Sequence, residues 1–177
     1  RVFFVVLLPD GAFAYLRLYS PGQIEALLTS FSEPELVRCS GPVARWHYHV
    51  PAEGWKTIGV PDAGESRIAA DEGWFQLTDE HLQALEQGSE ASFRKKLVHQ
   101  VGWPLTSESL SRIEQIVERA RSYGFKAQKD IATYAELACH YGSRLEEPKA
   151  ITVLQSEDKP AGERLAVIDS MMSYGDA

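Results

Sequence analysis

The spacing of apolar residues changes once along this chain of 177 residues, and the change limits the folds open to it. Before residue 61, strand-like segments alternate: Ala14, Leu16 and Leu18 share one face, and Phe13 and Tyr15 the other. Beyond residue 73, apolar residues recur at the three- and four-residue spacing of a helix. The chain is long enough for one sizeable domain or two small lobes, each with a core.

We therefore predict an α+β protein. Residues 1–60 are expected to form the second half of an N-terminal α/β lobe, with mixed β-sheet and short helices. Residues 61–73, polar and with two glycines, are expected to be a linker or a long surface loop. Residues 74–177 are expected to form a lobe of four or five helices.

Turn residues and helix caps mark where the predicted strands and helices of the N-terminal lobe begin and end. The sequence Pro9-Asp10-Gly11 predicts a hairpin between residues 2–8 and 12–19. A helix is predicted from Ser20-Pro21 to about Ser30, with an apolar stripe, and a second short helix after Ser32. The pair Gly41-Pro42 ends that helix and leads into a strand, "ARWHYHV", which pairs with "GWKTIGV".

Beyond residue 73, cap residues and glycines indicate where the helices begin and end. Thr78 and Ser107 open helices, and Gly88 weakens the middle of the first of them. Two further helices are expected, one ending at Gly142 and one over residues 163–173. The helix from Ser107 is expected to end at Gly124, which suits a left-handed cap.

Charge argues against two classes of partner. The net charge is −7, and all of it lies beyond residue 60. Nucleic-acid binders and proteins of anionic membrane surfaces need a basic surface, so neither partner is predicted. No apolar run is long enough to span a bilayer. Cys39 and Cys139 lack paired spacing and predict free thiols in a reducing cytoplasm.

The first residue, Arg1, leads directly into the apolar strand "VFFVVLL". Such a strand needs partners on both faces. We expect the chain to be a fragment of a longer protein that lacks upstream residues.

No phosphate-binding, nucleophile-elbow or zinc-protease motif occurs, so no catalytic residue or cofactor is predicted. His47 and His49 are the strongest metal candidates, because alternate residues of a strand share a face. Arg45 on the same face opposes a cation, and a third ligand would have to come from a distant histidine, His81, His99 or His140. A solvated polar face is favoured, with Trp46, Tyr48 and Val50 on the core side. Neither cysteine is expected to act as a nucleophile.

A set of motifs resembles the adaptor chaperones of type VI secretion, a family encoded beside effector and VgrG spike genes. The strand-helix motif of that family fits Arg17, Tyr19, Pro21, Leu27 and Leu28, and its Gly-Pro-x-x-Arg-Trp motif fits Gly41, Pro42, Arg45 and Trp46. Later positions fit at Phe93, Tyr123, Gly124, Asp130, Tyr134, Gly142, Leu154, Pro160 and Arg164. Ser20 stands where the family usually has Asp, and both residues cap helices.

The resemblance implies a protein without catalytic activity in the bacterial cytoplasm. It would bind a secreted effector, stabilise it and help to load it onto the VgrG spike. One or both of Arg17 and Arg45 are then expected to organise the lobe by pairing with a carboxylate or a carbonyl. Two alternatives stay open: an immunity-type or other protein-binding module, and a metal-dependent enzyme that uses His47 and His49.

Overall fold

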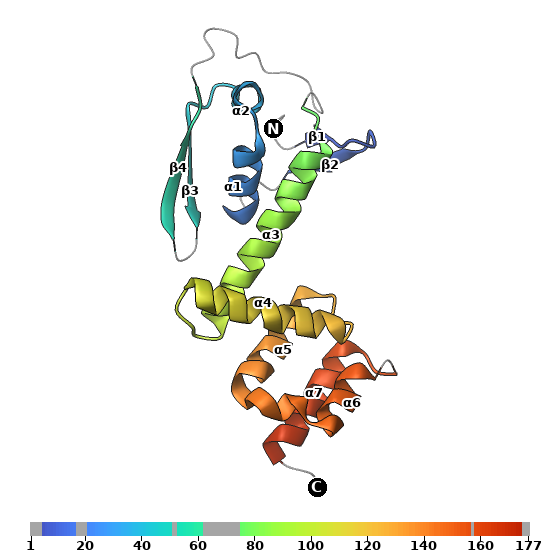
Figure 1. Cartoon of the computed structure of the whole chain (residues 1–177). Coiled ribbons are helices and arrows are strands. Elements are labelled where there is room, and N and C mark those ends of the chain that lie inside the picture. Colours follow the sequence, from blue (N-terminus) through green and yellow to red (C-terminus); the bar gives the residue numbers. More distant parts are fainter. Residues whose placement is uncertain (1–4, 17–20, 51–52, 62–74, 157, 175–177) are drawn as a thin grey trace. The chain divides into compact units, whose positions relative to one another are not determined.

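The computed structural model describes residues 5–16, 21–50, 53–61, 75–156 and 158–174. The predicted α+β class is confirmed, since small antiparallel sheets in the first part precede a mostly helical second part. The chain divides into two compact units, Arg1–Ser92 and Phe93–Ala177. The division lies inside the helix α3 (Asp79–Gln100) (Figure 1).

The first unit begins with the predicted hairpin. Strands β1 (Val5–Leu7) and β2 (Phe13–Tyr15) pair antiparallel, with Val6 opposite Ala14. The Asp10 carboxylate accepts a hydrogen bond of 2.9 Å from the Ala12 N–H, and Gly11 has the positive φ of 83° that the turn needs. The parts of the predicted strands at 2–4 and 17–19 lie outside the described residues.

Two short helices follow the hairpin, as predicted: α1 (Pro21–Ser30) and α2 (Glu33–Ser40). The predicted apolar stripe is buried: it comprises Ile24, Leu27 and Leu28 of α1, and Phe31 directly after the helix. The second predicted hairpin also forms, from β3 (Arg45–Val50) and β4 (Gly54–Gly59), and α1 packs against β3. The core of this unit comprises Val6, Ile24, Leu27, Leu28, Phe31, Leu36, Cys39, Tyr48, Val50, Phe75 and Leu77.

Helices α1 and α3 approach each other closely through small residues. A Cβ atom at Gly88 would lie 2.3 Å from the Cβ of Ala26, and one at Gly22 would lie 2.7 Å from the Cβ of Ser92. Real Cβ atoms do not come that close. The glycine that weakens α3 in isolation is therefore the residue that lets α1 pack against it.

The boundary between the units differs from the predicted one. The backbone of Leu7 pairs with the segment before α3: its N–H donates to the Phe75 carbonyl at 3.0 Å, and its carbonyl accepts from the Leu77 N–H at 2.9 Å. Both Phe75 and Leu77 are buried in the first core. Residues 75–92 thus belong to the first unit, although the sequence placed everything after residue 73 in the helical lobe. The predicted linker at 61–73 lies, except for Pro61, outside the described residues.

The second unit is helical, with α4 (Ser107–Ser122), α5 (Gln128–Tyr141), a 3₁₀ turn η2 (Gly142–Glu146), α6 (Pro148–Gln155) and α7 (Ala161–Tyr174). The predicted ends hold: Gly124 and Gly142 both have positive φ. Thr106 caps α4 through its side chain, which accepts from the Ser109 N–H at 3.1 Å. The sequence prediction missed α6, whose eight residues are too few for a helical period to show.

Candidate functional site

The β3–β4 ribbon carries the residues of the metal hypothesis, and its register fixes which side chains share a face. His47 pairs with Thr57, and His49 pairs with Trp55. Along both strands, exposed residues alternate with residues that are buried or half-buried. The predicted solvated face is therefore confirmed. We call its six exposed positions the outer face of the ribbon: Arg45, His47, His49, Trp55, Thr57 and Gly59.

The outer face holds its side chains in contact across the strands. Nδ1 of His47 lies 2.9 Å from the Thr57 hydroxyl, within hydrogen-bonding distance. The rings of His49 and Trp55 meet edge to face, with centroids 5.5 Å apart. The side chain of Trp55 is nonetheless 76% exposed, the most exposed tryptophan of the described residues. Because so little of this indole is buried within the unit, most of its apolar surface is available to a second molecule.

The opposite face of the ribbon holds the fold together. The indole N–H of Trp46 donates to the Ser40 hydroxyl at 2.9 Å, which ties β3 to the end of α2. Between them Gly41 turns the chain with φ of 53°. The predicted motif residues Arg45 and Trp46 therefore point to opposite faces, one exposed and one packed on the core.

A carboxylate pair anchors the second strand. The Lys56 ammonium lies 2.6 Å from both Glu25 of α1 and Glu53 of the turn. Hydrogen bonds to these two carboxylates raise the pKa of Lys56. Burial, with Glu25 nearby, raises the pKa of the Tyr48 hydroxyl, which stays protonated at neutral pH. Both carboxylates thus bind Lys56, which belongs to the half-buried alternation of β4.

The histidines do not assemble a metal site among the residues that the structure describes. Within them, no three His, Cys, Asp or Glu side chains are grouped so as to hold an ion. A zinc site requires three or four such ligands. His81, one of the proposed third ligands, is buried, and its Nδ1 is hydrogen-bonded to the backbone of Thr78.

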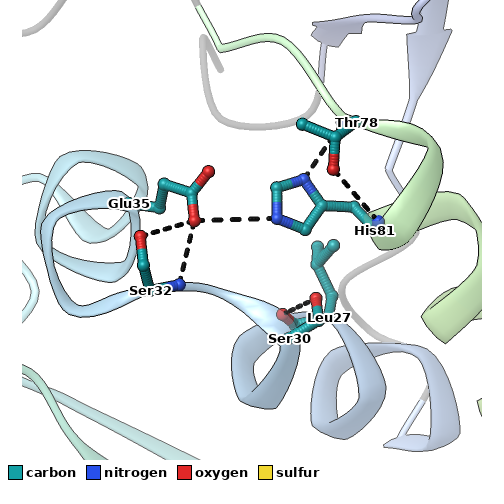
Figure 2. A network of polar contacts seen from close by, with 6 residues as sticks. All are labelled: Leu27, Ser30, Ser32, Glu35, Thr78 and His81. Carbon is teal, nitrogen blue, oxygen red and sulfur yellow. Dashed lines mark hydrogen bonds and ion pairs between the residues drawn. The ribbon is translucent and has the colours of Figure 1, made fainter.

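His81 belongs to a capping network that joins the starts of α2 and α3 (Figure 2). Its Nδ1 accepts from the Thr78 N–H at 3.1 Å, and the Thr78 hydroxyl accepts from the His81 N–H at 3.3 Å. Because Nδ1 accepts a hydrogen bond, the ring hydrogen lies on Nε2, which is 3.7 Å from a Glu35 oxygen. The predicted cap at Thr78 is confirmed, and the histidine reciprocates as the fourth residue of a capping box.

Glu35 of α2 connects Ser32 to the same network. It accepts from the backbone N–H of Ser32 at 2.9 Å and from the Ser32 hydroxyl at 2.6 Å. These hydrogen bonds, with the smaller contribution of His81, lower the pKa of Glu35. The sequence prediction identified Ser32 and Thr78 as caps but did not connect them. The signal that the sequence offers is a polar residue three positions after each cap, Glu35 and His81.

The two cysteines are free thiols, as predicted. Cys39 lies in the first core, and burial raises its pKa to about 12. Burial also raises the pKa of Cys139. A thiol that stays protonated is a poor nucleophile, so the geometry gives neither cysteine an activated form.

The remaining predicted motif residues fall in separate places. Arg17 and Tyr19 lie outside the described residues, Pro21 opens α1, and Pro42 is exposed. Tyr123 ends α4 and meets the ring of Tyr134 edge to face at 5.8 Å. Gly124 and Gly142 end helices. In the second unit the motif residues are therefore mainly helix ends and core contacts, and the structure does not bring them together into one site.

The exception is Arg164, a buried arginine that sequence reasoning treated only as part of a motif. Its guanidinium donates to the carbonyls of Tyr123 at 3.0 Å and Leu154 at 2.5 Å, and lies 4.6 Å from the centroid of the Phe125 ring. Both carbonyls are at helix C-termini, where the helix dipole favours a cation. Its Nε has no partner in the described part of the chain. Arg164, in the first turn of α7, thus joins the C-terminal ends of α4 and α6.

Each unit also has an open hollow. In the second unit, a hollow of about 700 Å³ between α5 and α7 is lined by Asp130, His140 and Asp169, among others. The Tyr141 hydroxyl, at its rim, donates to Asp169 at 2.8 Å. In the first unit a smaller hollow of about 260 Å³ has an apolar lining, which includes Tyr15 and Leu82.

No family model, no curated protein and no solved structure matches this chain. None of the helices in the described part combines the length and the apolar content needed to cross a membrane.

Proposed function

We propose that this protein is a non-catalytic adaptor that binds a secreted effector of a type VI secretion system and presents it to the VgrG spike. The observation that carries the proposal is the exposure of large aromatic side chains on both hairpins of the first unit. Phe13 and Tyr15 on β2 are 66% and 81% exposed, and Trp55 on β4 is 76% exposed. Aromatic residues of this kind dominate the binding energy of protein interfaces.

The chemistry of the other groups supports binding over catalysis. Both thiols have raised pKa values, so neither cysteine readily forms the thiolate that nucleophilic catalysis needs. The buried histidine of the first unit is used for helix capping. The resemblance at Gly41, Pro42, Arg45 and Trp46 supplies the secretion system and the effector as the specific partners.

The test is co-expression with the protein encoded by the adjacent gene. We expect a stoichiometric complex on size-exclusion chromatography, with a partner that is degraded or insoluble when expressed alone. Two proteins that are both stable and elute separately would refute the adaptor function. The natural full-length gene product is the material to use.

An immunity-type module is the second candidate, because exposed aromatics also suit the inhibition of a toxic enzyme. The two functions differ in one measurement. An immunity protein abolishes the catalytic activity of the bound toxin, whereas an adaptor leaves that activity in place and is required for export. The enzyme alternative calls for a metal assay of protein purified without chelator.

A further inference from the structure

The outer face of the β3–β4 ribbon is distinguished by its charge. Among its six positions are one arginine, two histidines and a tryptophan, and none carries a carboxylate. The chain as a whole has a net charge of −7. Two nearby carboxylates, Glu25 of α1 and Glu53 of the turn between the strands, bind Lys56, which lies in the inward-facing alternation of β4. Six positions with one permanent cation, two imidazoles and no carboxylate are electrostatically complementary to an acidic segment of a partner.

The geometry of the same face suits an extended segment. The register places Arg45, His47 and His49 in a row along β3, at every second residue. Trp55 stands across from His49 at one end of that row. With Nδ1 of His47 directed at Thr57, its Nε2 is left for an outside group. Alternate side chains of an extended peptide have the same spacing as this row.

We infer that the outer face of the ribbon binds an extended acidic segment of the partner protein. Carboxylates of the segment pair with Arg45 and the two histidines, and an apolar side chain packs on the Trp55 indole. The inference rests on the proposed function and adds to it the surface and the chemistry of the segment recognised. Arginine is suited to this role because its guanidinium binds a carboxylate through two parallel hydrogen bonds.

Two neighbouring possibilities are less well supported by the structure. A nucleic-acid strand also uses aromatic stacking, but it requires several permanent cations, and Arg45 is the only one on this face. Of the exposed pair Phe13 and Tyr15 on β2, Tyr15 lines the apolar hollow of the first unit, and none of the residues that line this hollow is charged. Nothing in that hollow therefore specifies the charge of an occupant.

The test uses the full chain and the protein encoded by the adjacent gene, with affinity measured by isothermal titration calorimetry. Arg45→Glu and Trp55→Ala should each weaken binding by about tenfold or more, because a central arginine or tryptophan contributes strongly to an interface. Two changes serve as matched controls at exposed positions of the second unit. Lys126→Glu makes the same change of charge, and Tyr174→Ala removes an aromatic side chain that is 85% exposed.

The outcomes separate the two proposals. If the wild-type chain does not bind the adjacent gene product, the adaptor function is wrong and the inference is wrong with it. If the wild type binds and both ribbon variants bind equally well, the adaptor function stands and this surface is wrong. Circular dichroism verifies that each variant is folded. Trp55→Thr replaces Trp55→Ala if the alanine variant unfolds, since threonine is favoured in strands.

Short overlapping peptides that tile the partner then test the chemistry. We expect acidic peptides to bind, with an affinity that falls as sodium chloride is added and that is lost in Arg45→Glu. Preferential binding of basic peptides through this face would overturn the inference. An oligothymidylate that binds the wild type and not Trp55→Ala would likewise overturn it, in favour of a nucleic acid.

Discussion

The close approach of α1 and α3 gives the sharpest test of the packing in the first unit. Replacing a glycine by alanine inside a helix ordinarily stabilises it by about 1 kcal/mol. At Gly88 the added methyl would lie 2.3 Å from the Cβ of Ala26 and 3.0 Å from the Gly22 carbonyl oxygen. Carbon atoms in contact lie about 3.5–4.0 Å apart, so the two helices would have to move apart by roughly 1 Å or more.

Separation of the helices costs more than the propensity gain. Both neighbours are fixed to the backbone of α1, so no side-chain rotation relieves the contact. Overpacking of a core costs about 1–3 kcal/mol, and the rigid contact points to the upper end of that range. Subtracting the gain of about 1 kcal/mol leaves an expected loss of about 2 kcal/mol for Gly88→Ala.

The assay is urea denaturation followed by circular dichroism, with hydrogen exchange of α1 peptides to report on the first unit alone. Gly162→Ala is the matched control, because a Cβ there meets nothing within 4 Å. Adding Ala26→Gly to Gly88→Ala should recover most of the loss, because it removes the overlapping methyl. If Gly88→Ala is as stable as the wild type or more stable, the reasoning about this helix contact is refuted.

Three further predictions concern buried or capping groups. Arg164→Leu should lower the free energy of unfolding of the second unit by about 3 kcal/mol, because it leaves the Tyr123 and Leu154 carbonyls without their charged donor. Urea denaturation measures the loss, and an unchanged midpoint would contradict it. Cys39, with its pKa at about 12, should react with a thiol reagent at pH 8 only as fast as the first unit opens, and immediate labelling of the native chain would contradict its burial. Because the pKa of Glu35 is lowered in the fold, its stabilisation is present above its unfolded pKa and is lost as the pH falls through its folded pKa. Glu35→Gln should therefore flatten the acid limb of a stability-pH curve, and a curve parallel to the wild type would exclude this contribution.

Much of the fold could be predicted because its signals are local. The hairpin at Asp10-Gly11, the caps at Ser32 and Thr78, and the helix end at Gly124 each depend on a few neighbouring residues. The alternation along β3 also predicted correctly which side of the strand faces the core. Short-range backbone preference and periodicity determine such features.

The rest depends on partners that are distant in sequence. Leu77 joins the first core by pairing with Leu7, a contact that no local pattern reveals, and so the predicted boundary was placed too early. The role of Gly88 depends on Ala26 in another helix. His81 looked like a free metal ligand until the fold engaged its Nδ1 with Thr78. The set of side chains on the outer face likewise depends on the register of two strands.

The position of Arg164 in α7 has a consequence for synthesis. Its guanidinium completes the ends of α4 and α6, and Leu165, Ile168 and Met172 of the same helix complete the second core. As the chain leaves the ribosome, α4, α5 and α6 all emerge before the helix that stabilises them. The first unit has all of its described elements by Ser92 and is free to fold early, whereas the second must wait for its last helix with apolar faces exposed to chaperones.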